Sequence, residues 1–372
     1  MTNMSLLAVV AIAGLAPLPA AEYFTYFGTY TGPNSKGIYV SRFDTATGKL
    51  TAPELAAEVA NPSWLTVHPN GRYLYAVSEL GKEGVLTSFS VDPTTGKLTQ
   101  KNRASTEGRV SCHIAISRDE RSIFVANYGD GSVTSLQLRA DGMIGDRVSF
   151  VKHSGSGPDT KRQGGPHAHA VVLSKDGKYL VVPDLGTDKY HVYRVGEGGQ
   201  LTAAEPAFTQ VKGGLGPRHF SFHPGGKFAY GLNEMGSSVT AFAYSGGQLK
   251  ELGTVSTLSQ GFDKENNSAE IEVDREGRFV YASNRGSDSI AVFAVDASKG
   301  TLSEVQREST QGSIPRGFSL DPSGKFLLAG NQKSDKVVVF VRNEKTGRLT
   351  PTGETVAVPS PVCIQFLAAK KR

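Results

Sequence analysis

Cysteine is nearly absent from this 372-residue chain, which contains only Cys112 and Cys363. Two cysteines exclude a disulfide scaffold and a zinc cluster built on cysteine ligands. A strong charge of one sign is also lacking, because 40 lysines and arginines stand against 35 aspartates and glutamates, for a net charge of +5. A mild basic excess spread along the chain suits a small anionic ligand better than duplex nucleic acid, which demands a clustered basic stripe.

Several motifs that signal a known chemistry are missing, among them a glycine-rich phosphate loop, an HExxH metal motif and a nucleophile elbow. Long apolar runs are missing too. The uncharged run at residues 6–16 is shorter than the about 20 residues of a membrane-spanning helix. It has the size of a signal-peptide core and ends near the small residues Ala20 and Ala21, although no lysine or arginine precedes it. We therefore expect residues 1–21 to be a signal peptide and the protein to be periplasmic or secreted, with the cytoplasm as the alternative.

Glycine, in contrast, is abundant, with 43 residues and no collagen period, which indicates many turns between short strands. One unit recurs six times: an apolar alternating run, a turn of the type HPNG or DPSG, and a second alternating run. The aligned turn positions are Gly71, Glu120, Gly177, Gly226, Gly277 and Gly324. Their spacings are 49, 57, 49, 51 and 47 residues.

Each unit continues with a third apolar run and then a turn of nearly constant sequence before a fourth run. The turn reads DTATGKL from Asp44, DPTTGKL from Asp92, DASKGTL from Asp296 and NEKTGRL from Asn343. Glycine there supplies the positive φ that the turn requires. Four short strands in a unit of about 50 residues are the signature of a propeller blade.

The two chain ends complete the ring. Residues 23–59 provide three strands without an inner one, and residues 361–367 provide one spare strand. Pairing them makes a seventh blade and removes two open sheet edges. The sequence therefore predicts an all-β protein: a single seven-bladed β-propeller domain over residues 22–372, closed by a C-terminal inner strand that completes the N-terminal blade, with no helix required.

The repeat also predicts where a site can form. Positions eight before and eight after each turn lie at the opposite end of the first hairpin, so they should crowd one mouth of the central channel. Eight before the turn, the units carry Ser63, Cys112, His169, Arg218, Ala269 and Arg316. Eight after it, they carry Glu79, Tyr128, Leu185, Glu234, Arg285 and Gln332. Both sets vary in chemistry, so the repeat itself does not need these residues.

The positions seven after the turn differ, because their chemistry is uniform. They carry Ser78, Asn127, Asp184, Asn233, Asn284 and Asn331. A short polar side chain that bonds back to its own backbone explains such a set in every blade. We therefore assign it to structure.

His169, Arg218, Glu234 and Arg285 form the candidate catalytic cluster. The arginine fork suits a carboxylate or a phosphate, and a histidine or glutamate beside it can move a proton near neutral pH. His219 follows Arg218 directly, so its side chain should face the other way. A purely structural ion pair between Arg218 and Glu234 is the competing interpretation.

Three further residues near this mouth are expected to bind substrate, namely His167, Arg316 and Gln332. The glycine-rich, basic segment at residues 154–165 makes the one long spacing of 57 and lies on the same face. Either a lid or an ordinary surface loop accounts for it.

Several segments together resemble the seven-bladed propeller lactonase family, which includes bacterial 6-phosphogluconolactonase and fungal 3-carboxy-cis,cis-muconate cyclase. They are YFGTYTG, GPHAHAV, GPRHFSFHP, LNE ending at Glu234, SNR ending at Arg285 and IPRGFSLDPSGKFLLAGNQKSD. The similarity spans nearly the whole chain after residue 22. The resemblance implies a site of one histidine, two arginines and one glutamate, which fall on His169, Arg218, Arg285 and Glu234.

The sequence and the resemblance together predict a metal-independent hydrolase of a sugar-type lactone that bears an anionic group, with no cofactor. Arg218 and Arg285 would bind the anionic group and the oxyanion. His169 or Glu234 would activate water, and the sequence does not decide which.

Two alternatives stay open: a lactonizing cyclase of the carboxymuconate type, and a secreted ligand-binding propeller without turnover. The expected partner is a small anionic lactone or its sugar-acid product. We expect no nucleic acid, no membrane span and a monomer.

Overall fold

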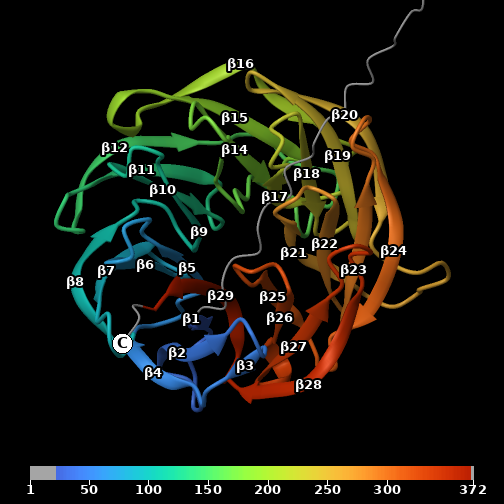
Figure 1. Cartoon of the computed structure of the whole chain (residues 1–372). Helices are drawn as coiled ribbons and strands as arrows, with labels where there is room; N and C mark the ends of the chain where they lie inside the picture. The colour runs from blue at the N-terminus through green and yellow to red at the C-terminus, as the bar shows by residue number, and fades with distance from the viewer. Residues whose placement is uncertain (1–21, 370–372) are drawn as a thin grey trace, which may run out of the picture.

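The computed structural model describes residues 22–369, which form seven antiparallel sheets arranged as blades in a ring (Figure 1). This arrangement confirms the predicted seven-bladed β-propeller. The predicted signal peptide at residues 1–21 lies outside the described residues. No helix in the described part of the chain is long and apolar enough to cross a membrane.

Six blades, numbered here in chain order, run from their first to their fourth strand without a crossover. The first blade contains β5 (Trp64–Val67), β6 (Tyr73–Ser78), β7 (Val85–Val91) and β8 (Leu98–Ser105). The second contains β9 (Ser111–Ile116), β10 (Ser122–Asn127), β11 (Ser132–Leu138) and β12 (Ile144–Lys152). The third contains β13 (Val172–Leu173), β14 (Tyr179–Asp184), β15 (Lys189–Val195) and β16 (Leu201–Gln210).

The next three blades repeat this order. The fourth contains β17 (Pro217–Phe222), β18 (Phe228–Asn233), β19 (Ser238–Ser245) and β20 (Gln248–Ser256). The fifth contains β21 (Asn267–Val273), β22 (Phe279–Arg285), β23 (Ser289–Val295) and β24 (Leu302–Ser309). The sixth contains β25 (Pro315–Leu320), β26 (Phe326–Asn331), β27 (Lys336–Arg342) and β28 (Leu349–Ala357). Two short 3-10 helices, η1 (Glu197–Gly199) and η2 (Gln332–Ser334), also occur.

The seventh blade closes the ring with both ends of the chain, as predicted. It contains β29 (Pro361–Ala368), β1 (Glu22–Thr29), β2 (Gly37–Asp44), β3 (Lys49–Leu50) and β4 (Glu54–Glu58). β29 pairs antiparallel with β1 from Tyr23 opposite Ala368 to Gly28 opposite Cys363, and it also packs against β25 and β5. At Gly28 any side chain would overlap the carbonyl oxygen of Pro62 in the first blade. Glycine therefore lets the closing blade approach its neighbour.

Apolar side chains fill the spaces between blades. A hydrogen bond that recurs in several blades also joins neighbouring blades. Tyr75 on β6 donates its hydroxyl to the carbonyl of Gly142 in the second blade at 3.0 Å. Tyr281 on β22 donates in the same way to Gly347 in the sixth blade at 2.9 Å. Both tyrosines are fully buried. These bonds tie the second strands of the first and fifth blades to the outer turn of the next blade.

The uniform polar set bonds only partly as we expected. Asn233 donates its side-chain amide to the hydroxyls of Ser238 and Thr240, both on the neighbouring strand β19. Asn127 makes the equivalent bonds to Ser132 and Thr134 on β11. The assignment to structure agrees with these contacts. In these two blades the partners are hydroxyls across the sheet, whereas Asp184 accepts the backbone N–H groups of Gly186 and Thr187 directly after it, as expected.

The first strand of the third blade is much shorter than the apolar run around it predicts. Regular pairing covers only Val172–Leu173, with one isolated bridge at Ala168. Between them, the backbone N–H of His169 donates to the carbonyl of Pro183 on β14 at 3.0 Å. Because proline has no N–H, Pro183 cannot donate the second backbone hydrogen bond that would pair it with His169 in a regular sheet. The sequence of β14 therefore interrupts the sheet beside His169.

Candidate active site

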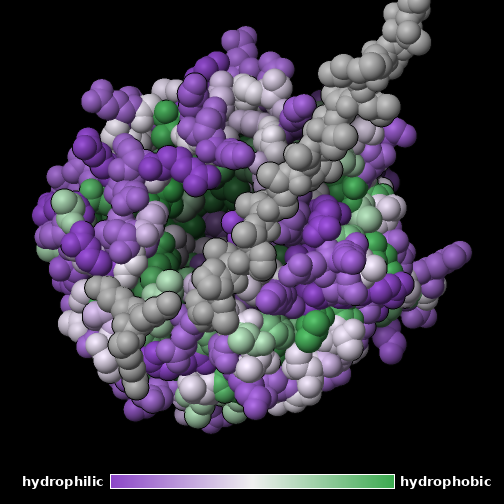
Figure 2. All heavy atoms as spheres, viewed as in Figure 1, coloured by the Kyte–Doolittle hydropathy of each residue, from purple (hydrophilic) through white to green (hydrophobic). Residues whose placement is uncertain are grey.

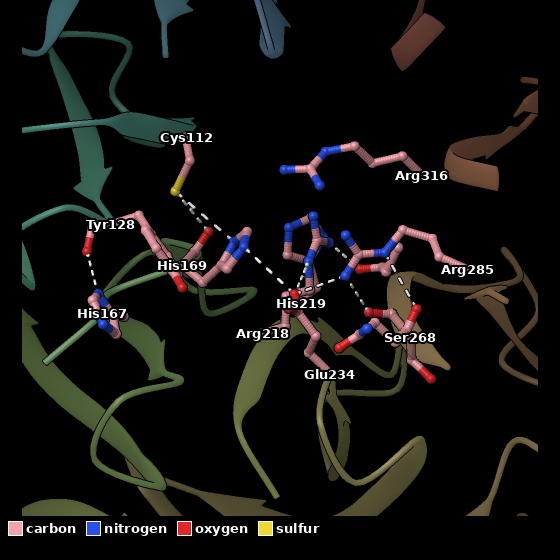
Figure 3. Close-up of polar contacts among 12 residues, drawn as sticks. Cys112, Tyr128, His167, His169, Arg218, His219, Glu234, Ser268, Arg285 and Arg316 are labelled. Carbon is pink, nitrogen blue, oxygen red and sulfur yellow. Dashed lines mark hydrogen bonds and ion pairs between the residues drawn. The ribbon is translucent and has the colours of Figure 1, made fainter. Parts of the chain in front are cut away.

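The four predicted catalytic residues meet at one mouth of the central channel (Figure 3). Arg218 lies on β17 and Glu234 directly follows β18, so one hairpin of the fourth blade carries both. Arg285 ends β22 of the fifth blade, and His169 precedes β13 of the third. Three neighbouring blades therefore contribute to one cluster.

The carboxylate of Glu234 is the centre of this cluster. Its Oε2 atom lies 2.9 Å from Arg218 Nε and 2.9 Å from Arg285 Nη2. Its Oε1 atom lies 2.6 Å from Nη2 of Arg162. Nε2 of His169 lies 3.9 Å from Oε2. The expected pair of Arg218 and Glu234 is thus one contact of a larger network.

His169 is held by backbone and side-chain contacts on several sides. The thiol of Cys112 donates to the carbonyl oxygen of His169 at 3.3 Å. Edge-on ring contacts to Tyr128 and His219 have centroid distances of 5.2 and 5.4 Å. The imidazole is therefore fixed while its Nε2 atom faces Glu234.

A cavity of about 290 Å³ opens over this cluster. It is lined by Glu79, Cys112, Tyr128, Arg162, His169, Glu234, Asn267, Arg285 and Arg316. Its size is close to the lower end of the range for small-molecule sites. The hollow near the centre of the ring face in Figure 2 contains hydrophobic residues, unlike the lining of this cavity, in which charged residues predominate.

Arg316, which the sequence predicts to bind substrate, lies on the cavity wall. Its guanidinium is 3.9 Å from the carboxylate of Glu79 and rests on the ring of Tyr30 at 5.2 Å. The hydroxyl of Tyr30 in turn donates to Glu79 at 2.7 Å. Within residues 22–369, the side chain of Arg316 makes no hydrogen bond, and Figure 3 shows it directed toward the cluster. Its donors are therefore available to a ligand.

The other two expected substrate-binding residues lie outside the lining of the cavity, as far as the structure describes it. His167 stacks on Tyr128 at a centroid distance of 4.4 Å, and its Nδ1 is 2.8 Å from the carbonyl oxygen of Tyr128. It therefore supports a residue of the wall. Gln332 begins the 3-10 helix η2, where its backbone N–H donates to Ile314.

Arg162 is the site residue that sequence reasoning missed. It belongs to the glycine-rich segment at residues 154–165, for which the sequence left a lid and a surface loop open. Gln163 is fully buried and its side-chain amide donates to the carbonyl of Leu185 at 2.8 Å. The carboxylate of Asp159 accepts the backbone N–H of Arg162 at 3.1 Å. The loop is thus tied down and adds an arginine to the mouth.

Burial and neighbouring charge set the protonation of the central pair. Burial, and then the charge of Arg218, hold the pKa of His169 well below its usual 6.5, so the imidazole is neutral at pH 7. Burial alone would raise the pKa of Glu234. The charges of Arg285 and Arg218 outweigh burial and lower that pKa far below its usual value. Glu234 is therefore a fixed anion.

The channel beneath the cavity holds a second buried pair. His219 lines this channel rather than the mouth cavity, which agrees with its predicted direction, and its Nδ1 lies 2.9 Å from Oε1 of Glu270. Burial raises the pKa of Glu270 to about 8 and lowers that of His219 well below 6.5. Both groups are therefore mainly neutral near pH 7. Trp64 packs nearby on the ring of His113 at 4.1 Å.

One group of three side chains in the described residues has the composition of a metal site, but it lies apart from the cavity. It comprises His153, Asp184 and His191. Nδ1 of His153 and Oδ2 of Asp184 are 2.6 Å apart, a hydrogen-bond distance, and the two histidine rings stack at 3.7 Å. Asp184 also accepts the backbone N–H of His167 at 2.9 Å. This group therefore fixes the segment that leads to His169.

The chain matches the family model described as lactonase, seven-bladed beta-propeller, over residues 24–366. It is 37% identical over 348 residues to the 6-phosphogluconolactonase of Bacillus subtilis, covering 93% of this chain and 99% of that protein. It is 35% identical over 302 residues to the 6-phosphogluconolactonase of Formosa agariphila, covering 79% and 85% of the two chains.

Solved structures give a consistent result. The periplasmic gluconolactonase of Pseudomonas aeruginosa superposes with a TM-score of 0.89 at 38% identity, over 94% of this chain and 100% of that chain. The match extends over essentially the whole described propeller. It therefore includes all the blades that contribute to the cavity.

Proposed function

Because the chain belongs to the seven-bladed β-propeller lactonase family, we propose that it hydrolyses a sugar-type lactone that carries an anionic group. The relatives support lactone hydrolysis, since two are named 6-phosphogluconolactonase and one gluconolactonase. The anionic group is an inference from the charge of the cavity. A neutral imidazole surrounded by an excess of arginines is the observation that carries the proposal.

The charge around the cavity favours an anion. The groups at its wall and floor include four arginines and two glutamates, namely Arg162, Arg218, Arg285, Arg316, Glu79 and Glu234. With His169 neutral, they leave an excess of two positive charges. Guanidinium groups in a partly desolvated site bind carboxylate or phosphate through paired hydrogen bonds. The same charge stabilises the acid that hydrolysis releases.

His169 is the general base in this proposal. Its neutral imidazole takes a proton from water, and the resulting hydroxide attacks the lactone carbonyl carbon. The carbonyl oxygen becomes an oxyanion, which the free donors of Arg316 and the nearby charge of Arg218 stabilise. The C–O bond of the ring then breaks, and the protonated His169 returns its proton to the leaving oxygen. Lactone and water thus become one hydroxy acid.

Glu234 acts as a fixed anion rather than as a proton carrier. Its low pKa makes its carboxylate a weak base. It instead orients Arg218 and Arg285, each at 2.9 Å, and stabilises the imidazolium of His169 that forms during the reaction.

The reaction as proposed needs no metal ion. Four guanidinium groups near the cavity repel a divalent cation, and the carboxylates of Glu79 and Glu234 already lie beside arginines. The donor set therefore suits an anion better than a cation. Chelator treatment should leave activity unchanged.

The test is a lactonase assay on purified protein with gluconolactone and 6-phosphogluconolactone, with and without chelator, after subtraction of spontaneous hydrolysis. We expect chelator-insensitive turnover of at least one lactone. Absence of turnover on both, together with binding of the product acids, would instead identify a ligand-binding propeller.

We also propose that the protein is exported. The apolar run at residues 6–16 and the similarity to a periplasmic gluconolactonase support this location. N-terminal sequencing of the protein from its native host should find a start near residues 21–23. An intact Met1 on protein from the cytoplasmic fraction would overturn this proposal.

A further inference from the structure

Arg162 differs from the other arginines of the cavity in its place and its exposure. Its side chain is 39% exposed, whereas those of Arg218 and Arg285 are 3% and 13% exposed. It comes from a loop, whereas the others lie on strands of the propeller. It therefore stands at the entrance to the cavity.

Arg162 also contacts a different carboxylate oxygen of Glu234 from the other two arginines. Arg218 and Arg285 both contact Oε2, whereas Oε1 is contacted by Arg162 alone among the described residues. Loss of the Arg162 contact would therefore leave the carboxylate held by two arginines. It would also free one oxygen that faces the cavity.

The loop fixes the backbone of Arg162, whereas the side chain interacts with Glu234 and Tyr128 and not with the loop. Gln163 anchors the loop to Leu185, and Gln163 N–H donates to the carbonyl of Asp159 at 2.6 Å. The backbone of this segment is thus held in place, so the segment is not a hinged lid. A change of partner by Arg162 requires only side-chain rotation.

We propose that Arg162 selects lactones by their anionic substituent, exchanging its ion pair with Glu234 for one with that substituent. This inference rests on the proposed function: Arg162 would be the residue that distinguishes substrates by their charge. A phosphate with two negative charges is a stronger partner than a carboxylate already compensated by two arginines. The freed Oε1 of Glu234 then accepts a hydrogen bond from a sugar hydroxyl.

The test compares the binding of two acids that differ only in the phosphate, 6-phosphogluconate and gluconate, by calorimetry. The proteins are the wild type, Arg162→Gln and the matched control Lys161→Gln. Lys161 is the exposed neighbour of Arg162 in the same loop and carries the same charge. Equal thermal melting curves would establish that all three proteins are folded.

We expect the wild type to prefer 6-phosphogluconate, and Arg162→Gln to weaken that binding by about 10- to 100-fold, the size of a lost charge-assisted contact. Binding of gluconate should change less than about threefold, and Lys161→Gln should behave like the wild type. A similar loss for both acids, the same loss in Lys161→Gln, or no preference in the wild type would overturn the inference.

The outcome is separable from that of the proposed function, because binding of the acids does not need turnover. A preference that depends on Arg162 in a protein without lactonase activity would refute only the proposed reaction. Lactonase activity with no such preference would refute only the role of Arg162.

Discussion

His169 and Glu234 face each other across 3.9 Å, measured from Nε2 to Oε2, although they come from different blades. This separation is longer than a hydrogen bond. The pair therefore combines a neutral imidazole with an ionised carboxylate, whose charge would stabilise the imidazolium if His169 took up a proton. Three arginines around Glu234 keep the anion ionised throughout.

Replacing each member of this pair should have distinct effects. His169→Asn should lower kcat by about 10²–10⁴-fold, because the general base is lost, with product binding unchanged. Glu234→Gln should also lower kcat, but it removes a negative charge from the cavity and should bind the product acid at least as tightly as the wild type. Kinetics and calorimetry on both variants check this. Full activity of a folded His169→Asn protein would remove His169 from the mechanism.

The pH dependence of activity should reflect the depressed pKa of His169. Burial and Arg218 keep the imidazole neutral, so kcat/KM should fall only well below pH 6.5. An NMR titration of the histidine rings, with His169→Asn for assignment, tests the same shift directly. An acid limb of kcat/KM centred at or above pH 6.5 would contradict the proposed environment.

Arg218→Lys should be nearly as damaging as Arg218→Ala. Arg218 contacts Glu234 through Nε and the carbonyl oxygen of Ala269 through Nη1. One ammonium group cannot reproduce this fork. We expect kcat/KM to fall by about 10²–10³-fold.

Arg147→Lys, at an exposed ion pair, is the control and should show no effect. If the ion pair of Arg218 and Glu234 were purely structural, the result would differ. Arg218→Lys would then lower the Tm, and the remaining activity would be proportional to the amount of folded protein.

Ring closure should depend on the C-terminal strand. Deletion of residues 361–372 removes β29, which pairs along β1 and packs against β25 and β5. The exposed strand edges should make the protein aggregate. Gly28→Val tests the same closure without truncation, because a side chain there overlaps Pro62. A truncated protein that stays soluble and melts cooperatively would show that closure is not required.

The buried Glu270 should make stability depend on pH. Its pKa is raised to about 8 in the folded protein by burial, above the usual 4.5 of the unfolded chain. Its contribution to stability is therefore full below about pH 4.5 and is lost as the pH rises through about 8. Glu270→Gln should gain in Tm relative to the wild type over this range, whereas Glu265→Gln, at an exposed residue, should not. A Tm difference that is constant with pH would argue against the shifted pKa.

Much of the fold could be predicted because its signals are local. Turn glycines at a near-constant spacing and alternating apolar runs predict four-stranded blades, and each blade follows from its own segment. Gly96 illustrates this, because its φ of +74° is required by the turn itself. Ring closure followed as well, because a missing strand at one end matched a spare strand at the other.

The site was predictable only in part. Residues at repeat positions, such as Arg218 and Glu234, could be placed at one mouth because the period fixes their height in the blade. Arg162 has no repeat position, since it lies in an inserted loop. The short ladder beside His169 depends on Pro183, which lies opposite it on the next strand.

The sequence by itself thus determined the seven blades, their closure and the mouth at which charged side chains gather. These properties depend on turn chemistry and on a period of about 50 residues. Only the tertiary structure decided which of these groups are neutral and which are charged. Protonation depends on burial and on distances between blades, and those distances bring three arginines to Glu234 while leaving His169 neutral.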